Sequence, residues 1–424
     1  MLYFSIESED RPLEQEQIKN ALIAAIEAAG QGKDLLIIPP DISRMHSGAG
    51  LITRMIWDEY RDKVKAILPA TGTHKAMTKD EISLMYGSLA PGLFSEHDCR
   101  HDILTLGKIP GSFISEASGG KLNYDWPVQV NRLIARHKGS LIISVGQVVP
   151  HEVTGMANYN KNIFIGCGGY ESINKSHFLS AVCGIENIMG KAKNPVRDII
   201  NRGESLFASH LNILYVLTVV DKGPDGTPAI KGIFTGTDIE CFTRASRLSA
   251  KLNITLTDRA PGKMLVYLDP AIYRSTWLGN KAIYRTRMAI ADKGELVIIA
   301  PGVSKFGEDD IIDGLIRKYG YRTSEEILHL VKENADLQEN LGAAAHLIHG
   351  STENRFRVTY CAGGLAEKEI RSVGFDYGGI EETEDRFKTG NLREGFNISS
   401  GGEEFYYIAN PGMGLWSTAD KLSV

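Results

Sequence analysis

The chain has 424 residues, of which 43% are hydrophobic and 23% are charged. These proportions are those of ordinary soluble globular proteins and exclude a wholly disordered chain, and at about 100–200 residues per domain the length predicts two or three domains. Fifty-two acidic against 47 basic side chains give a formal net charge of −5, so neither nucleic acid nor an anionic membrane is an expected partner.

The N-terminus has no basic stretch followed by a long apolar run, and no apolar run in the chain approaches the roughly 20 residues of a membrane-spanning helix. The five cysteines are scattered and include no Cys-x-x-Cys pair, which favours reduced core residues over disulfides or a zinc site. We therefore expect a cytoplasmic protein.

Short apolar runs rich in β-branched residues alternate with helix-like segments along the chain. The predicted strands cover residues 34–40, 64–68, 140–145, 213–220, 264–268 and 296–300. Near-continuous apolar strands separated by helices are typical of buried, largely parallel sheets. The sequence therefore predicts an α/β fold, with two α/β domains, largely parallel sheets and a cleft between the domains.

Other local signals place helices, turns and the domain boundary. Thr78-Lys-Asp-Glu81 predicts a capping box at the start of a helix. Residues 239–251 are expected to be helical, residues 222–228 to form a turn between extended runs, and residues 308–370 to be mostly helical. The Arg-Ala-Pro-Gly segment before residue 263 interrupts the regular pattern and comes before a new strand. It predicts a boundary between a catalytic and cofactor-binding domain at 1–262 and a second α/β domain at 263–424.

Polar side chains follow two of the predicted strands. Pro39-Pro-Asp41-Ile-Ser-Arg44 comes directly after the first strand, and Asp41 and Arg44 either cap and pair with each other or bind a ligand. Ala70-Thr-Gly-Thr-His-Lys75 lies between a strand and a helix start, where Lys75 either binds an anion or is a surface lysine in a polar turn.

Histidines form a third group of candidates. Ser95-Glu-His97-Asp-Cys-Arg-His101-Asp holds two histidines and two aspartates, but the spacing does not match a zinc motif. An acid/base role for His97, with His101 as the alternative, is therefore the better functional prediction.

A strand that ends in Val145-Gly-Gln-Val-Val-Pro-His151 presents His151 where parallel sheets bind ligands. The glycine-rich segment 155–170 that follows holds Lys161 and suits close approach to a phosphate or cofactor. Lys305, in a loop after the 296–300 strand, either reaches into the interdomain cleft or is a solvated lysine.

These residues resemble the nickel-pincer lactate racemase family of 2-hydroxyacid racemases and epimerases. Lys161 lies ten residues after His151, and His177 lies twenty-six residues after it; these intervals are similar to those between the family's catalytic histidine, cofactor lysine and nickel-ligating histidine. His97 in Glu-His-Asp-Cys resembles a family His-Asp pair that supplies the other acid/base, and Thr73-His-Lys75 resembles the family's Thr-His-Arg. Further similar positions cover most of the chain: Asn194-Pro195, Phe234-Thr-Gly236, Asp269-Pro270, Lys281-Ala282 and Gly302 to Gly307.

The resemblance implies a cofactor in which carbon and sulfur atoms of a pyridinium mononucleotide hold nickel. His177 would be the protein ligand of the metal. Lys161 would bind the cofactor, and we expect Asp41, Arg44 and Thr73 to join it. Proteins of cofactor synthesis are the implied partners, and a host without that pathway is expected to yield protein without cofactor.

The implied reaction is racemisation or epimerisation of a small 2-hydroxy acid by reversible hydride transfer from C2 to the nickel-pincer nucleotide. Catalysis on both faces of the planar 2-oxoacid requires two bases, which the resemblance assigns to His97 and His151. Lys75 and Lys305 would bind the substrate at the rim of the same cavity.

The chain departs from the family pattern at two places. Lys75 stands where the family commonly has arginine, and its compact ammonium favours a sugar acid or another substrate with additional polar groups over lactate. Asn158-Tyr-Asn-Lys-Asn162 replaces the usual Ser-Gly-Gly-Ala-Lys, and the Pro-Gly that follows in the family is absent.

Two other functions remain open from the sequence. One is a cofactor-free racemase or a dehydratase that uses His97 and His151 directly. The other is a non-catalytic binding protein for an anionic sugar acid or nucleotide, in which Lys75, Lys161 and Lys305 neutralise charge. Nickel content and visible absorbance of the purified protein distinguish the three.

Overall fold

The computed structural model describes residues 1–30 and 32–422, which fold into two compact units. The first unit is Met1–Leu179 with Ile188–Asn253, and the second is Ser180–Asn187 with Ile254–Val424. The sequence analysis expects the boundary at residue 262, whereas the chain enters the second unit at Ile254. The short segment Ser180–Asn187 also belongs to the second unit, and no local sequence pattern indicates this.

Within the described part of the first unit, the main sheet has six strands in the order β1-β10-β9-β6-β2-β3. The strands β9, β6, β2 and β3 are mutually parallel, and β10 and β1 are added antiparallel at one edge. All four predicted strands of this region are confirmed. The bounds are β1 (Leu2–Glu7), β2 (Leu35–Ile38), β3 (Val64–Ile67), β6 (Leu141–Gln147), β9 (Ile213–Lys222) and β10 (Pro228–Gly236).

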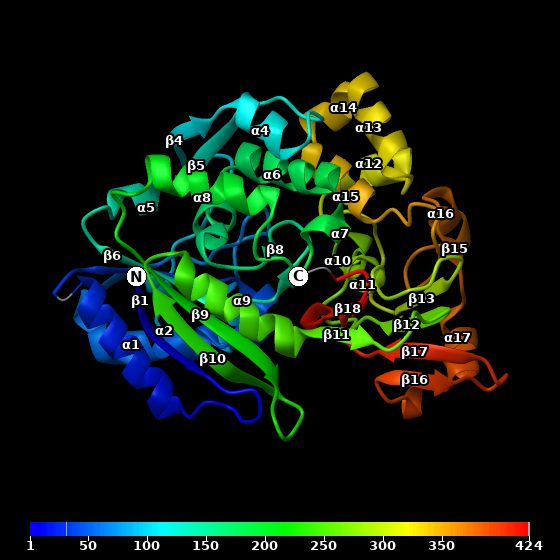
Figure 1. Ribbon diagram of the computed structural model, residues 1–424, viewed down its shortest axis with the longest axis horizontal. Coiled ribbons are helices and arrows are strands. Elements are labelled where there is room, and N and C mark those ends of the chain that lie inside the picture. Colours follow the sequence, from blue (N-terminus) through cyan, green and yellow to red (C-terminus); the bar gives the residue numbers. More distant parts are fainter. Residues whose placement is uncertain (31, 423–424) are drawn as a thin grey trace. The chain divides into compact units, whose positions relative to one another are not determined.

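The strands β2 and β6 are completely buried because helices pack on the sheet, as expected for a parallel sheet. For example, α9 contacts β9 and β10 (Figure 1). The capping box of Thr78 and Glu81 is confirmed at the start of α3. The helices in this part of the chain are α1 (Gln15–Gly30), α2 (Ala49–Tyr60), α3 (Lys79–Tyr86), α4 (Gly111–Ala117), α5 (Arg132–Arg136), α6 (Tyr170–Cys183), α8 (Pro195–Phe207) and α9 (Ile239–Asn253), while α7 (Ile185–Ile188) lies almost entirely in the segment that belongs to the second unit.

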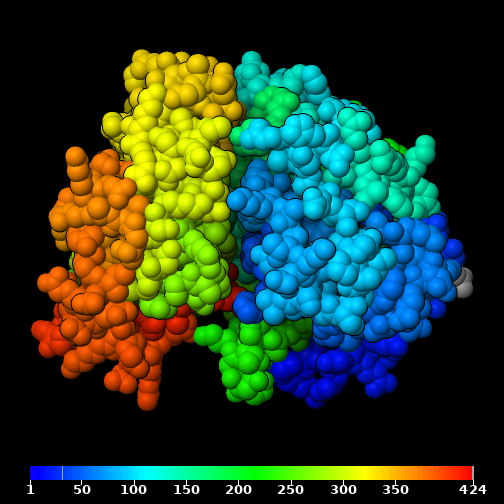
Figure 2. All heavy atoms as spheres, turned by 180° about the vertical axis from the view of Figure 1, so that it is seen from behind, coloured from blue at the N-terminus to red at the C-terminus, as the bar shows by residue number. Residues whose placement is uncertain are grey.

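Two small antiparallel ribbons complete the first unit, and the second of them contains His151. The first pairs β4 (Ile103–Ile109) with β5 (Trp126–Asn131), and the second pairs β7 (Pro150–His151) with β8 (Gly155–Met156). The face in Figure 2 shows the light-blue part of the chain, which contains the 71–101 region, at the surface of this unit.

The second unit has its own mostly parallel sheet, whose described strands follow the order β15-β14-β13-β12-β17-β16, with only β16 antiparallel to its neighbour. A separate parallel pair joins β11 and β18. The strands are β11 (Ile254–Thr257), β12 (Lys263–Tyr267), β13 (Glu295–Ala300), β14 (Arg357–Ala362), β15 (Asp376–Tyr377), β16 (Gly395–Ile398), β17 (Glu404–Ile408) and β18 (Leu415–Thr418).

The segment 308–370 is mostly helical, as predicted, but it also contains β14, which the sequence analysis misses. The six residues of β14 become a strand because they pair along their whole length with β13. The helices of this unit are α10 (Thr276–Gly279), α11 (Lys281–Thr286), α12 (Asp310–Tyr319), α13 (Ser324–Glu333), α14 (Ala335–Glu339), α15 (Leu341–His349), α16 (Glu367–Ser372) and α17 (Ile380–Phe387). Within the described residues, no helix is both long and apolar enough to cross a membrane.

Candidate functional site

The carboxyl ends of β2 and β3 bring two polar loops together in the first unit. Pro40 and Ala70 form an isolated parallel bridge just beyond these strands. Asp41 comes directly after Pro40, and the turn that contains His74 comes shortly after Ala70. A further backbone hydrogen bond of 2.8 Å, from Gly72 N to Gly166 O, ties this turn to the segment after Lys161. This edge of a parallel sheet is the usual ligand-binding edge.

Asp41 and His74 form a hydrogen-bonded pair, with 2.7 Å between Asp41 Oδ2 and His74 Nδ1. Burial acts to raise the pKa of the Asp41 carboxyl, but hydrogen bonds from His74 and Ser43 and the nearby charge of Arg44 outweigh it and lower that pKa below its ordinary value. Because Asp41 is a carboxylate at neutral pH, His74 Nδ1 carries a proton, and the neutral ring presents its lone pair at Nε2. The side chain of His74 is 42% exposed, so this nitrogen is accessible.

Lys161 lies at the same end of the sheet because the next residue is fixed there. The Asn162 side-chain amide donates to the carbonyl of Ile38 at 2.9 Å and to Ser144 Oγ at 3.1 Å. Asn162 begins a π-helical turn, Asn162–Gly166. Among the described residues, no side chain or carbonyl forms a hydrogen bond with the Lys161 amine.

The electrostatic surroundings of Lys161 identify its neighbours. Burial first and the charge of Arg44 second lower the pKa of Lys161 to about 8, while Glu152 and Asp41 act in the opposite direction. An amine with this pKa is partly neutral at physiological pH and therefore nucleophilic. Arg44 is half-buried and supplies a permanent positive charge to the group.

His177 lies on α6 and belongs to the same group of charges. Its Nδ1 donates to the carbonyl of Ile173 at 2.7 Å, which leaves the Nε2 lone pair available in the neutral ring. Burial lowers the pKa of His177 to about 4, with smaller contributions in the same direction from Lys161 and His74 and an opposing one from Glu152. The ring is thus neutral at physiological pH, the form that binds a metal ion.

His151 follows β6 and is buried. Its Nδ1 accepts hydrogen bonds from the backbone amides of Val153, at 3.1 Å, and Thr154, at 3.4 Å. The proton of the neutral ring is therefore on Nε2. In neutral rings, His151 Nε2 is thus a donor atom, whereas His74 Nε2 is an acceptor atom.

His97 has a different environment from the one that the sequence predicts for an acid/base. It is only 6% exposed, its Nε2 donates to the carbonyl of Gly168 at 3.1 Å, and its Nδ1 accepts from the Asn131 amide at 3.0 Å. Burial lowers the pKa of the ring. Both nitrogens are thus engaged by the protein, so its hydrogen bonds do not favour the predicted catalytic role, which stays a prediction.

The alternative to His97 and the cavity beside it give no stronger candidate. His101 is exposed, and its Nδ1 lies 2.8 Å from Oδ2 of the exposed Asp98. His97 does line a cavity of about 150 Å³, whose other walls include Thr71 and Ala76 on the two sides of the His74 turn.

The other predicted binding residues occupy exposed or separate positions. Thr73 and Lys75 are both exposed on the His74 turn, and within the described chain neither side chain forms a hydrogen bond. Lys305 lies in the second unit, after β13, and its amine donates to the carbonyl of Glu308 at 3.0 Å. The structure therefore brings together Asp41, Arg44, Lys161 and His177, but leaves the binding roles of Lys75, Thr73 and Lys305 as predictions.

The glycines of the 155–170 segment make room for the chain itself. A Cβ on Gly155 would lie 1.9 Å from the carbonyl oxygen of Lys191, and one on Gly168 would lie 2.1 Å from that of Phe164. At these two glycines, the space in which we expected a phosphate or cofactor to approach the backbone is therefore filled by the protein's own main chain.

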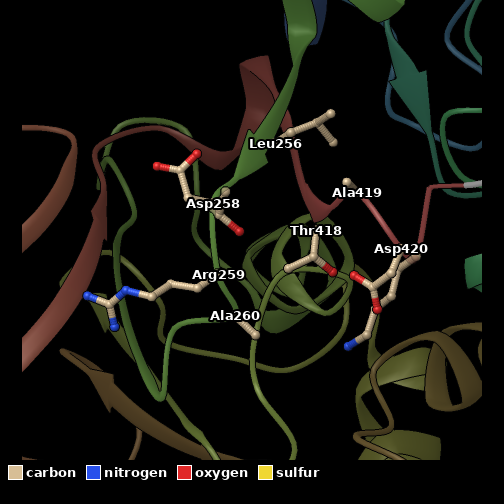
Figure 3. A pocket seen from close by; sticks show the side chains of 9 residues that line it. Leu256, Asp258, Arg259, Ala260, Thr418, Ala419 and Asp420 are labelled. Carbon is tan, nitrogen blue, oxygen red and sulfur yellow. The ribbon is translucent and has the colours of Figure 1, made fainter.

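A cavity of about 450 Å³ in the second unit contains none of the predicted site residues (Figure 3). Its walls come from the ends of β11 and β18, with Asp258, Arg259 and Asp420 among the lining residues. Within the described residues, no three or more histidine, cysteine or acidic side chains are grouped so that they could hold a metal ion.

The sequence analysis misses His74, Glu152 and Arg197. The signal for His74 is present, because Thr-His-Lys follows a strand and precedes a helix, but its carboxylate partner lies thirty-three residues away. Glu152 is next to His151 and acts on both Lys161 and His177. Arg197 carries no local signal because it lies on a helix that begins at Pro195.

Comparison with known proteins agrees with this architecture. Residues 5–188 match the family model of the lactate racemase N-terminal domain, whereas no curated protein matches the chain. A crystal structure of a protein from Thermotoga maritima has a TM-score of 0.81 at 23% identity and covers 97% of this chain and 100% of its own. The lactate racemase apoprotein from Thermoanaerobacterium thermosaccharolyticum has a TM-score of 0.71 at 16% identity, with 96% of this chain and 93% of that chain covered.

The two structural matches share the fold over nearly the whole chain, and the family model covers Asp41, His74, His151, Lys161 and His177. The lactate racemase resemblance inferred from the sequence is therefore confirmed. Residues 5–188 thus match the family model of the lactate racemase N-terminal domain, and the chain as a whole has the fold seen in the lactate racemase apoprotein.

Proposed function

We propose that this protein is a racemase or epimerase of a 2-hydroxy acid that works with a nickel-pincer nucleotide. The observation that carries the proposal is the convergence of an Asp41–His74 pair, a partly neutral Lys161 and a neutral His177 around one end of a parallel sheet. The match of residues 5–188 to the family model of the lactate racemase N-terminal domain supports the reaction class.

The residues present fit the proposed cofactor. His177 would be the protein ligand to nickel, since its Nδ1–H is held by the Ile173 carbonyl and its Nε2 is the available donor atom. Lys161 would lie against the nucleotide, because its amine has no hydrogen-bond partner among the described residues. When bound, the cofactor would supply the acceptor and donor for the hydrogen at C2 of the substrate.

In this proposal, His74 replaces His97 as the first acid/base. Its Nε2 accepts the proton of the substrate hydroxyl, and the Asp41 carboxylate stabilises the imidazolium that forms. His151 would be the second acid/base, which gives a proton to the carbonyl oxygen of the 2-oxoacid when hydrogen returns to C2 on the other face. This role needs a ring protonated on both nitrogens, so the backbone hydrogen bonds that His151 Nδ1 accepts would have to open. For the opposite enantiomer the two roles exchange.

Arg44 is the better candidate for the substrate carboxylate than Lys75. Its guanidinium can bind a carboxylate through two parallel hydrogen bonds, and its charge acts on Asp41 and Lys161. The substrate remains a small 2-hydroxy acid. The preference for a sugar acid, which rests on Lys75, stays a prediction.

The test is to load the full-length protein with the nickel-pincer nucleotide and incubate it with single enantiomers of 2-hydroxy acids deuterated at C2. We expect the opposite enantiomer or epimer to appear with deuterium retained at C2, because the hydrogen does not exchange with water. Cofactor-free protein and the His177→Ala variant serve as controls. Turnover without cofactor, or complete loss of deuterium, would favour a cofactor-free racemase; binding without any turnover would favour a binding protein.

A further inference from the structure

The turn that carries Lys161 has an unusual backbone. Asn158 and Tyr159 both have positive φ angles, 62° and 59°, although neither is glycine. This left-handed conformation is unfavourable for residues with a Cβ, and two in succession need strong support from the surroundings. The turn directly precedes Lys161, so its shape decides the direction in which the lysine leaves the backbone.

Arg197 on α8 supplies most of this support. Its guanidinium donates to the carbonyl of Met156 at 2.6 Å, to the carbonyl of Asn158 at 3.3 Å and to Asn160 Oδ1 at 2.7 Å. Arg197 is only 1% exposed, and its guanidinium lies 4.3 Å from the centre of the Phe242 ring. The planar fork of an arginine can reach all three acceptors at once, which an ammonium group cannot do in the same geometry.

Asn160 connects this arginine to a second anchor on the same helix. Its side chain is completely buried, and its amide donates to Asn201 Oδ1 at 2.7 Å and to Glu204 Oε2 at 2.8 Å. Glu204 also accepts a hydrogen bond from the Tyr215 hydroxyl on β9. The negative charge of Glu204 balances the positive charge of Arg197 in a region that excludes water.

Aromatic packing fixes the remaining side chain of the turn. The Tyr159 ring lies 4.3 Å from that of Tyr215 and is stacked at 5.3 Å on that of Phe242. Tyr159 and Asn160 are thus held from three elements, α8, β9 and α9. Lys161, in contrast, has no hydrogen bond of its own to a described residue, so its orientation depends on the turn.

We propose that Arg197, Asn160 and Glu204 form a clamp that holds the 158–161 turn in its strained conformation and thereby positions the Lys161 amine at the site. Arg197 is a positioning residue here, since it acts through the turn. The inference deepens the proposed function, because it takes Lys161 as a working residue of that site.

The experiment compares Arg197→Lys with Arg202→Lys in full-length protein without cofactor. Both arginines lie on α8, but Arg202 is exposed and stacks over Phe113 at 4.7 Å, so it provides the matched control. The first measurement is hydrogen exchange of the peptide 156–162. We expect exchange about tenfold faster in Arg197→Lys, because lysine lacks the planar guanidinium that reaches all three acceptors. We expect no change in the control or in β9.

The second measurement is the rate at which limiting acetic anhydride acetylates Lys161 at one fixed pH, with the exposed Lys138 and Lys332 as internal references. A purely structural role of Arg197 would leave this relative rate unchanged. We expect it to fall about fivefold or more in Arg197→Lys, because a relaxed turn lets the amine become solvated and protonated. An unchanged or increased rate would overturn the proposal.

Asn160→Ala provides a second variant if Arg197→Lys does not fold. It removes one anchor while keeping the charge of Arg197, and we expect about a twofold to threefold lower acetylation of Lys161. Unchanged exchange of the peptide 156–162 in this variant would also overturn the clamp. Because neither measurement uses cofactor or substrate, a protein without racemase activity would contradict the proposed function and leave this test intact.

Discussion

The loops that carry His74 and His97 are close in sequence and both belong to the first unit, yet the two histidines have different hydrogen-bond partners. His74 is on an exposed turn with a carboxylate at one nitrogen, whereas His97 is buried between an amide and a carbonyl. A carboxylate stabilises the protonated ring and leaves the second nitrogen available. Two neutral partners instead fix one tautomer and use both nitrogens. The comparison shows that the partners of a histidine, more than its neighbours in the sequence, decide whether it can exchange protons.

Replacing each histidine by alanine in the cofactor-loaded protein gives the largest expected difference. His74→Ala should lower kcat by about 10²–10⁴, the usual contribution of a positioned acid or base. His97→Ala should lower kcat less than about tenfold per folded molecule, since the ring has no free nitrogen. Rates of racemisation by polarimetry or chiral chromatography measure both. A greater loss in His97→Ala would restore the assignment made from the sequence.

The same two variants should show the reverse order in stability. His97→Ala leaves the Gly168 carbonyl and the Asn131 amide buried without their partner, which should cost about 2–4 kcal/mol. His74→Ala removes an exposed side chain and should cost less than about 1 kcal/mol. Urea unfolding followed by tryptophan fluorescence gives both values. Equal midpoints would show that the His97 hydrogen bonds contribute little.

Arg44 and Lys75 provide a third comparison, which concerns binding of the substrate carboxylate. We expect Arg44→Lys to raise KM for the hydroxy acid about tenfold, because the paired hydrogen bonds to the carboxylate are lost. Lys75→Ala should change KM less than about threefold, since the side chain is exposed. A panel that includes lactate and sugar acids is the suitable assay. A larger effect of Lys75→Ala would support the sequence prediction that Lys75 binds the carboxylate.

Asp41→Asn should have the smallest effect, and that effect depends on pH. The pKa of Asp41 is lowered in the folded protein, so the folded state binds fewer protons than the unfolded state. The hydrogen-bonded Asp41 carboxylate therefore stabilises the protein above the ordinary aspartate pKa of about 3.9, and this stabilisation is lost as pH falls through the lowered folded value.

Thermal unfolding of the wild-type and Asp41→Asn proteins as a function of pH measures this contribution. We expect a difference of less than about 1 kcal/mol at pH 6, because the His74 partner is 42% exposed, and we expect this difference to diminish at low pH. Ser43→Ala keeps the carboxylate and its bond to His74, so it serves as the control. A difference that is constant with pH would mean that charge is not the cause.

The strands before Asp41, His74 and His151 could be read from the sequence because each is a short segment made mostly of apolar residues. Such runs fold as buried parallel strands wherever helices cover them, and polar residues after them lie at the ligand-binding edge. The strand β14 could not be recognised, since its six residues follow a long helical stretch and pair with β13. The segment Ser180–Asn187 is assigned to the second unit by its packing alone.

The sequence by itself determined the α/β class, the edge of the sheet at which the polar residues gather, and the intervals from His151 to Lys161 and His177. Only the tertiary structure decided which histidine has a carboxylate partner, because Asp41 and His74 are brought together by the pairing of β2 with β3. It also decided the chemistry of Lys161, whose pKa reflects burial and charges at Arg44, Glu152 and Asp41. Proton affinity depends on distances through space, and these exist only once the sheet has formed.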